Sequence, residues 1–496
     1  MDARVEPAPP KPLTHLEIRS IIFGIMLAML LAALDQTIVA TAMPTIGREL
    51  GDLEHLPWIV TAYLLASTAV TPLYGKFSDT HGRRVTLLIG IATFLVGSVA
   101  CALAPTMLIL IVARGLQGLG GGGLISLAQT IIADVVAPKE RGRYQVYIAS
   151  VFMASSLLGP VLGGFIAEHL HWSVIFWINI PLGLLALWMT NASLRRLPRH
   201  DRRHRLDVLG AALLIGATVS LMLALSWGGL RFPWLSVQVL GLVAVSALFW
   251  AAFALRQWGA REPLIPLDVL RNPVVRSGTL AACFGMGIYI GLSIYLPIYF
   301  EGVRGMSSTQ SGLCLIPLMV GTVVGATTSG RAMARFRHYK RLPIGGLLVA
   351  MTGTGILAAF AQGLPLVWLE LTLAAISVGL GTLLPVTTVS IQNAVVPHQL
   401  GTATGAMNFF RQLGGALIVS LFGAIVLGGA AAGTEAATHE TLKSALAAGP
   451  ALAGIFRFVF LAALAGFGLA LAFLIGMEER PLRGSAAKAA GSAIAD

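Results

Sequence analysis

The chain has 496 residues, of which 56% are hydrophobic and 11% are charged, and its formal net charge is +12. Soluble domains usually carry about 25% charged residues, so the composition excludes a soluble globular protein and indicates a polytopic membrane protein. The three cysteines, Cys101, Cys283 and Cys314, are odd in number and lie in apolar stretches. We therefore expect no disulfide framework, no bound metal and no redox cofactor.

The first 19 residues are rich in proline and lack the succession of a cleavable signal, so we expect a short cytoplasmic tail there. Mostly apolar segments of about 20 residues, the length that crosses the hydrocarbon core, then follow along the chain. We predict about fourteen spanning helices from hydropathy. They lie at 20–43, 57–75, 85–103, 106–131, 144–167, 173–192, 207–227, 235–256, 277–300, 311–330, 342–361, 366–390, 403–428 and 454–477.

The basic residues are distributed unequally between alternate loops. With the N-terminus inside, 27 of the 34 Lys and Arg residues fall in segments on the cytoplasmic side. This asymmetry explains the net charge without a nucleic-acid partner. It also favours an even number of helices with both termini cytoplasmic, in the cell membrane, which would be the inner membrane of a bacterium.

An internal repeat divides the chain into two halves. It comprises Gly120, Gly122, Pro138 and Gly142, which recur 259 residues later as Gly379, Gly381, Pro397 and Gly401. The copies keep the same orientation, as in parallel halves related by an axis along the membrane normal. We predict a tail at 1–19, a six-helix bundle at 20–195, a basic loop with two inserted helices at 196–274, a second six-helix bundle at 275–478 and a tail at 479–496.

Asp35 is the only acidic residue that lies well inside an apolar segment. An ionised carboxylate at the bilayer centre costs roughly 2.5 to 3.5 kcal/mol on insertion scales, so its presence indicates proton or ion transfer. The alternative is a structural aspartate that is hydrogen-bonded to a neighbouring helix. Arg114, in the fourth segment, also needs a partner, unless its side chain extends to an interface.

The loop after the second segment reads GKFSDTHGRR over residues 75–84. Its glycines, Gly75 and Gly82, permit a tight turn, and Asp79 is placed to accept hydrogen bonds or to face a helix N-terminus. The basic residues are expected to pair with acids at the same helix ends, and Asp134 is such an acid. The residues of this expected gate are Gly75, Asp79, Gly82, Arg83, Arg84, Asp134 and Arg141. The alternatives are an ordinary basic loop and, for Asp134, a simple helix-end salt bridge.

Two further strings combine glycine with proline or arginine. Residues 114–123 read RGLQGLGGGG, a glycine-rich face that permits close helix approach. Residues 155–164 read SSLLGPVLGG, in which Pro160 should kink the helix while Gly159, Gly163 and Gly164 let a neighbour pack against the bend. A purely structural kink is the alternative.

These strings resemble motifs A, B and C of the major facilitator superfamily, and motif C is associated with antiporters. Residues 34–44, LDQTIVATAMP, resemble motif D1. With WINIP at 177–181 and RQLGGA at 411–416, they are similar to the fourteen-helix drug/proton antiporter-2 family. The resemblance implies an all-α integral membrane protein with the major facilitator fold and a pairing of Asp35 with Arg114. Thr80 departs from motif A, which usually has a basic residue there.

Other polar and aromatic residues give weaker signals. Glu370, near an outer helix end, is the best second carboxylate for coupling, although an interfacial position is the ordinary interpretation. The candidates for a substrate cavity are Gln36, Tyr63, Gln117, Phe152, Tyr289, Tyr295, Asn408 and Arg411. For any one of the aromatic residues, packing or lipid contact is the alternative.

The chain contains neither a phosphate-binding G-x-x-x-x-G-K-[ST] loop nor an H-E-x-x-H motif, so we expect a transporter driven by a proton gradient and not an enzyme. We predict a monomeric antiporter that exports hydrophobic, cationic small molecules by alternating access, with Asp35 attracting both protons and cations. The alternatives are a dedicated exporter of one metabolite, siderophore or lipid-like compound, and a scaffold or receptor that no longer transports.

Overall fold

Long helices account for nearly all of the computed structural model, which describes residues 15–52, 55–196, 207–229, 231–260, 262–360, 363–431 and 449–482. No β-strand occurs in these ranges. Thirteen helical spans of the described chain are long and apolar enough to cross a membrane. The chain is therefore a multi-pass membrane protein.

The first half of the chain and the following pair of helices contain α1 (His15–Glu49), α2 (Trp58–His81), α3 (Arg83–Ala102), α4 (Met107–Gly121), α5 (Leu124–Val135), α6 (Pro138–His169), α7 (Val174–Trp177), α8 (Asn179–Ser193), α9 (Val208–Trp227) and α10 (Val237–Gly259). The second half contains α11 (Leu267–Arg271), α12 (Pro273–Arg304), α13 (Ser308–Leu313), α14 (Ile316–Arg335), α15 (Arg341–Ala359), α16 (Leu366–Ala394), α17 (Leu400–Ala431) and α19 (Gly449–Gly476).

Helix α2 is the fourteenth long segment. It has 24 residues, which is enough to span the hydrocarbon core, but its Thr, Ser and Tyr residues make it less apolar than the other thirteen. Several of these polar side chains, including Ser67, Thr68 and Thr71, are buried against other helices and not exposed to lipid. The fold prediction of an all-α membrane protein with about fourteen spanning helices is confirmed.

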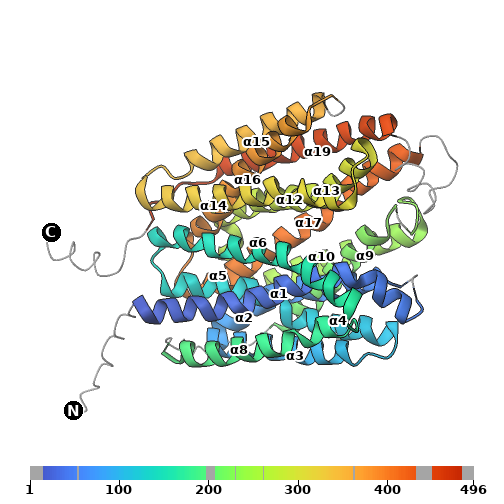
Figure 1. Ribbon diagram of the computed structural model, residues 1–496. Coiled ribbons are helices and arrows are strands. Elements are labelled where there is room, and N and C mark those ends of the chain that lie inside the picture. Colours follow the sequence, from blue (N-terminus) through green and yellow to red (C-terminus); the bar gives the residue numbers. More distant parts are fainter. Residues whose placement is uncertain are drawn as a thin grey trace, which may run out of the picture.

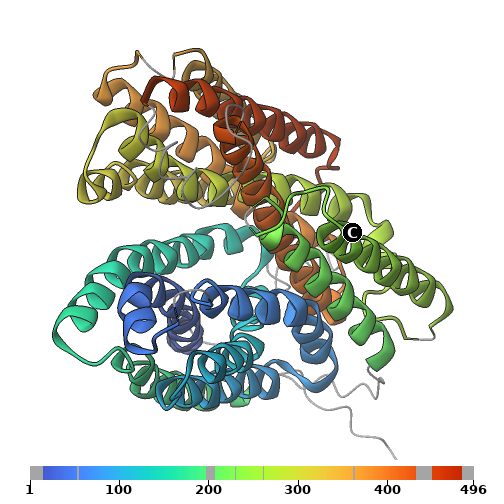
Figure 2. The same ribbon diagram turned by 90° about the vertical axis from the view of Figure 1, so that its right-hand side faces the viewer.

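The helices form two bundles that lie one above the other in Figure 1, α1 to α8 below and α12 to α19 above. The bundles meet along a seam, which we define as the contacts of α2 and α5 with α17 and of α6 with α14 and α16. Figure 2 shows the same two groups from the side, with α9 and α10 as a separate green pair beside them.

The pair α9 and α10 packs against the α2 and α17 side of the seam. Phe253 of α10 and Leu214 of α9 share an apolar cluster with Phe409 and Leu413 of α17. The start of α9 is joined to the end of α10 by the buried Asp207, which accepts hydrogen bonds from Gly210 N and from Arg256 Nε. At the other end, the rings of Trp58 and Trp227 lie 5.9 Å apart.

Glycines bring the two bundles into backbone contact. A Cβ on Gly75 of α2 would overlap the carbonyl oxygen of Gly401, and a Cβ on Gly142 would lie 2.9 Å from that of Gly330. Gly82 has φ +88°, a conformation that L side chains rarely adopt, and it joins α2 to α3 by a tight turn. We call the end of the molecule that contains this turn the Asp79 end.

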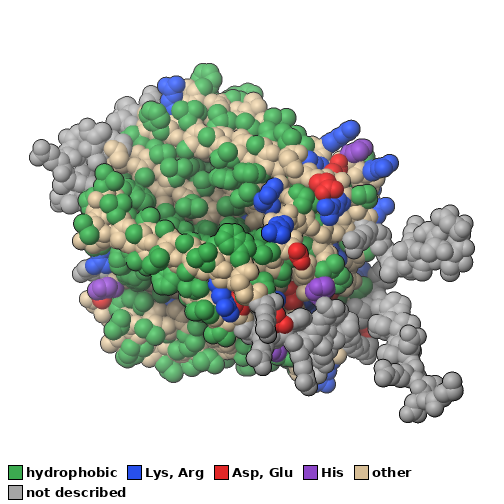
Figure 3. Space-filling model, turned by 180° about the vertical axis from the view of Figure 1, so that it is seen from behind, with side chains coloured by type: hydrophobic (Ala, Val, Ile, Leu, Met, Phe, Trp, Pro, Cys, Tyr) green, Lys and Arg blue, Asp and Glu red, His purple; other side chains and the backbone are tan. Residues whose placement is uncertain are grey.

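The outer surface is apolar around the middle of the molecule. Large hydrophobic side chains of the long helices, such as Val112, Trp188 and Leu248, are exposed. Figure 3 shows a broad hydrophobic surface with most of the visible charged side chains gathered on one side. This distribution is that of a protein whose middle lies in lipid and whose ends lie in water.

Candidate functional site

The Asp35 cluster is a set of buried polar residues in the first bundle. Asp35 and Arg114 are each only 1% exposed, and Arg114 Nη1 lies 2.6 Å from Asp35 Oδ2. The other carboxylate oxygen, Oδ1, accepts hydrogen bonds from Gln117 Nε2 at 2.8 Å and from Asn179 Nδ2 at 2.9 Å. The expected ion pair between α1 and α4 is present, and both oxygens of the carboxylate have donors.

The guanidinium of Arg114 has partners on several sides. Besides Asp35, it donates to the carbonyl oxygen of Ile59 at 3.1 Å and to Gln117 Oε1 at 2.6 Å. The ring of Tyr63 lies beneath it, 4.4 Å from Cζ, which is within the range of a cation–π contact. A buried ion pair tolerates the loss of water only when additional hydrogen bonds satisfy both groups, and the Asp35 cluster meets that requirement.

Two members of the Asp35 cluster were not predicted from the sequence. Ser98 of α3 accepts hydrogen bonds from Gln117 at 2.7 Å and from Asn179 at 3.2 Å. Asn179 of α8 lies inside the WINIP string at 177–181, which was noted without a role for the asparagine. Tyr63 and Gln117 are predicted to line a substrate cavity. Both are buried inside the first bundle in this conformation, and their role in a cavity stays a prediction.

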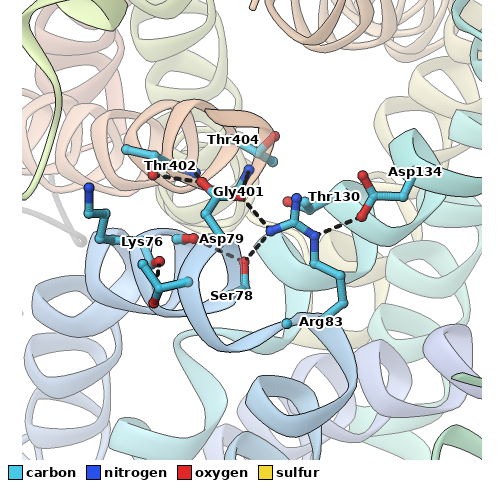
Figure 4. A network of polar contacts seen from close by, with 12 residues as sticks. Lys76, Ser78, Asp79, Arg83, Thr130, Asp134, Gly401, Thr402 and Thr404 are labelled. Atoms are coloured by element: carbon cyan, nitrogen blue, oxygen red, sulfur yellow. Dashed lines mark hydrogen bonds and ion pairs between the residues drawn. The ribbon is translucent and has the colours of Figure 1, made fainter. Parts of the chain in front are cut away.

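The second site is a latch at the Asp79 end, which we define as Asp79, Arg83 and Asp134 of the first bundle with Gly401 and Thr402 of the second (Figure 4). Asp79 Oδ1 accepts a hydrogen bond from Gly401 N at 2.9 Å, and Oδ2 accepts from Thr402 N and Thr402 Oγ1, each at 2.7 Å. These donors form the first turn of α17, where the helix dipole also favours an anion. The latch therefore fastens one bundle to the other.

Arg83 is the counter-ion of the two carboxylates of the latch, and all three residues belong to the first bundle. Its Nη1 lies 2.5 Å from Asp79 Oδ1, and its Nε lies 2.7 Å from Asp134 Oδ2. Figure 4 shows the guanidinium between the two carboxylates. One arginine thus connects the α2–α3 turn to the end of α5.

Three other residues near the latch differ from the expectation. Arg84 pairs with an amide and not an acid, since it donates to Asn191 Oδ1. Arg141 donates to the carbonyl oxygens of Val136 and Ala133, the unpaired groups at the end of α5, while Asp134 pairs with Arg83, the other partner expected for it. Thr80 hydrogen-bonds within its own turn, to the carbonyl oxygens of Lys76 and Phe77.

Helix α6 packs on α1 through two of its predicted glycines. A Cβ on Gly159 would overlap Thr37 Oγ1, and one on Gly163 would overlap Thr41 Oγ1. Pro160 is within the helix and exposed. A Cβ on Gly164 would have no neighbour within 4 Å, so the predicted role of this glycine in packing was wrong.

The remaining candidates lie in different environments. Glu370 is half-buried and accepts a hydrogen bond from Cys314 Sγ at 3.3 Å, far along the chain from the Asp35 cluster. Gln36 and Phe152 are exposed, and Tyr289 is partly buried. Tyr295 lines a cavity of about 220 Å³ between α2, α9, α12 and α17, together with Thr61, Leu65 and Ser420.

Several polar side chains form hydrogen bonds between the bundles in the middle of the seam. Asn408 Nδ2 donates to Gln129 Oε1 at 2.8 Å, which joins α17 to α5. Thr68 donates to Gln412 Oε1 at 2.8 Å, which joins α2 to α17. Arg411, between these two residues of α17, is only 7% exposed and points to α16.

The two-bundle arrangement and its seam define a transporter fold with parallel halves. The model of the Major Facilitator Superfamily matches residues 25–419. The chain therefore belongs to the major facilitator superfamily, and it is a transporter and not an enzyme.

Similar proteins include two from Bacillus subtilis (strain 168). Multidrug resistance protein 3 is 34% identical over 407 residues, which cover 82% of this chain and 79% of that protein. Multidrug transporter protein MdtP is 32% identical over 409 residues, 82% of this chain and 75% of that protein. The proton:xylose symporter XylE shares the fold, with a TM-score of 0.64, 16% identity, and coverage of 95% of this chain and 98% of that one.

Proposed function

We propose that the protein is a proton-coupled antiporter that exports hydrophobic drugs and similar small molecules by alternating access. The observation that carries the proposal is the Asp35 cluster, a carboxylate and a guanidinium buried together in a membrane bundle. Ionisable groups in that position are costly and are retained for ion pathways and proton relays. The names of the two Bacillus relatives support drugs as the cargo.

Protonation of Asp35 would change the packing of several helices. A neutral carboxyl loses most of its attraction for Arg114, which then needs other partners in a low-dielectric interior. The carboxylate is also the acceptor for Gln117 of α4 and Asn179 of α8. Since α1 itself packs on α6 through Gly159 and Gly163, a shift of α1 would reach a helix of the seam. Proton binding would thus change the relative stability of the conformations open to the two sides of the membrane, which is the requirement for coupling.

The latch indicates to which side of the membrane this conformation is closed. We place the Asp79 end in the cytoplasm, because the loops at this end are rich in Lys and Arg. With the latch closed, this conformation is closed toward the cytoplasm. Both termini would then be cytoplasmic, and we expect a monomer in the inner membrane of a bacterium.

The preference for cationic substrates was expected because Asp35 would attract them. In this conformation Arg114 already neutralises Asp35, and the pair is enclosed in the first bundle. A cation would have to displace Arg114 to reach the carboxylate. We therefore propose hydrophobic cargo without a requirement for positive charge.

The test is proton movement in proteoliposomes that contain the purified protein, on addition of a panel of lipophilic cations, neutral drugs and anions. Wild type should move protons in response to at least one compound, and Asp35→Asn should not, although it remains in the membrane. Asp268→Asn, which removes an exposed acid in α11, is the matched control and should behave as wild type. Wild-type proton movement by Asp35→Asn would reject the coupling role, and no response by the wild type to any compound would reject antiport.

A further inference from the structure

Arg411 is a buried arginine in the middle of α17. Its Nη2 group makes all of its hydrogen bonds within the described chain, and these go to three oxygens of α16. They are Thr388 Oγ1 at 2.8 Å, Thr387 Oγ1 at 3.3 Å and the carbonyl oxygen of Leu384 at 3.4 Å. All three acceptors are neutral, so none of them compensates the positive charge.

The rest of the Arg411 guanidinium has no acceptor in the part of the chain that the structure describes. The buried Nε of Arg411 has no hydrogen-bond partner among the described residues. Arg114 and Arg83, by contrast, each lie against at least one carboxylate. Arg411 therefore differs from both in its electrostatic environment: its charge is enclosed by protein, and no acid in the described chain pairs with it.

The surroundings of Arg411 are polar but uncharged. Its neighbours on α17, Asn408 and Gln412, reach across the seam to Gln129 of α5 and to Thr68 of α2. The acids of α2 and α5, Asp79 and Asp134, lie at the Asp79 end and are held by Arg83. In the described central turns of α2, α5, α16 and α17, Arg411 is the only charged side chain.

We propose that Arg411 binds an anionic group, a carboxylate or sulfonate, on the hydrophobic molecule that the transporter carries. A guanidinium presents five N–H donors in a planar fork that matches such groups, and low dielectric strengthens the pairing. The N–H groups not directed at α16 supply the donors. This inference rests on the proposed function only in taking the bound molecule to be cargo.

A structural role is the competing explanation. Arg411 contacts α16 beside Pro385, which interrupts the hydrogen bonding of that helix. If Arg411 only tied α17 to α16, its loss would weaken binding of every ligand alike. Selectivity for charge separates the two explanations.

The experiment measures equilibrium binding to the full chain in nanodiscs of zwitterionic lipid, with empty nanodiscs to subtract partition into lipid. The probes are pyrenebutyrate, its neutral methyl ester and a pyrenebutyl trimethylammonium cation, which share one aromatic group and differ in charge. The variants are Arg411→Gln, Arg411→Lys, which keeps the charge without the fork, and Arg457→Gln, which removes an exposed arginine of α19.

We expect wild type to bind the anion more tightly than the ester or the cation. Arg411→Gln should weaken anion binding about tenfold or more and leave ester binding unchanged, because one charge-assisted interaction is lost. Arg411→Lys should keep part of the preference, and Arg457→Gln should keep all of it. Equal weakening of the three probes by Arg411→Gln, or tighter wild-type binding of the cation, would overturn the proposal.

Proton movement separates this inference from the proposed function. A wild type that binds the anion selectively but moves no protons would keep the Arg411 site and reject antiport. Proton movement driven by the ester or the cation, with no selective binding of the anion, would keep antiport and reject the Arg411 site.

Discussion

Individual buried charges in this protein have different environments. Asp35 has Arg114 and two amide donors, and Arg83 has two carboxylates, whereas Arg411 has only neutral acceptors. Breaking a buried pair leaves an uncompensated charge, so the partnered groups should be sensitive to loss of their neighbours. Substitution of a neutral hydrogen-bond partner should therefore lower stability measurably, as substitution of the charged residue itself would.

Asn179→Leu should destabilise the protein and slow transport, because it removes a donor from Asp35 Oδ1 and leaves the carboxylate under-satisfied. Hydrogen bonds to charged groups contribute about 1.5 to 3 kcal/mol, and we expect a loss of that order in the free energy of unfolding. Asn191→Leu, which removes the acceptor of Arg84 near a helix end, is the control and should cost less, because Arg84 and Asn191 are both only half-buried and water can replace the lost bonds. Thermal unfolding of the two purified variants measures the difference, and equal losses would contradict it.

At the scale of elements, close helix contact depends on which face carries the glycine. Gly159 and Gly163 lie four residues apart on α6 and face α1, whereas the adjacent Gly164 faces away. The hydroxyl groups of Thr37 and Thr41 occupy the space that a side chain on the first two glycines would need. The packing of α1 on α6 is thus specific to position and not to glycine content.

Gly163→Ala should therefore reduce both stability and transport, while Gly164→Ala should leave both close to wild type. Inserting a methyl group into a tightly packed contact typically costs about 1 to 3 kcal/mol. Melting temperature and drug efflux, measured for the two variants side by side, test this prediction. A larger effect at Gly164 would contradict the orientation of α6 against α1.

At the scale of the whole molecule, the seam is fastened at one end. Asp79, Gly75 and Gly142 of the first bundle all meet the second bundle at the Asp79 end. The cavity of about 220 Å³ lies on the other side of the Thr68–Gln412 contact and includes α9 in its lining. The inserted pair thus borders the less tightly packed part of the seam.

Asp79→Asn should shift the population toward conformations that are open at the Asp79 end, because the carboxylate accepts all three inter-bundle hydrogen bonds of the latch. Asp134→Asn is the matched control, since the ion pair of Asp134 within the described ranges is with Arg83 of its own bundle. Spin labels on the exposed residues Lys139 and Arg335 report the distance between the bundles. A loss of charge-assisted bonds of about 1.5 to 3 kcal/mol would change the population ratio roughly tenfold or more, and no difference between the variants would remove Asp79 from the latch.

Much of the fold could be predicted from the sequence, because lipid imposes a length and a composition on every spanning helix. The Asp35–Arg114 pair could also be predicted, because burying either charge in the membrane without a partner costs free energy. The role of Ser98 could not be predicted, because the few hydroxyl residues of an apolar helix give no periodic signal. The partners of Arg141 and the outward direction of Gly164 depend on helix rotation, which the spacing of residues along the chain does not determine.

The division of contacts within the latch has a consequence for its kinetics. The bonds from Asp79 to Gly401 and Thr402 cross between bundles, but the bonds from Arg83 to Asp79 and Asp134 do not. If the bundles separate as proposed, Asp79 keeps its counter-ion and exchanges two N–H donors and one hydroxyl donor of α17 for water. Such an opening would expose no bare charge, so we expect a lower barrier to release than if the ion pair itself crossed between the bundles.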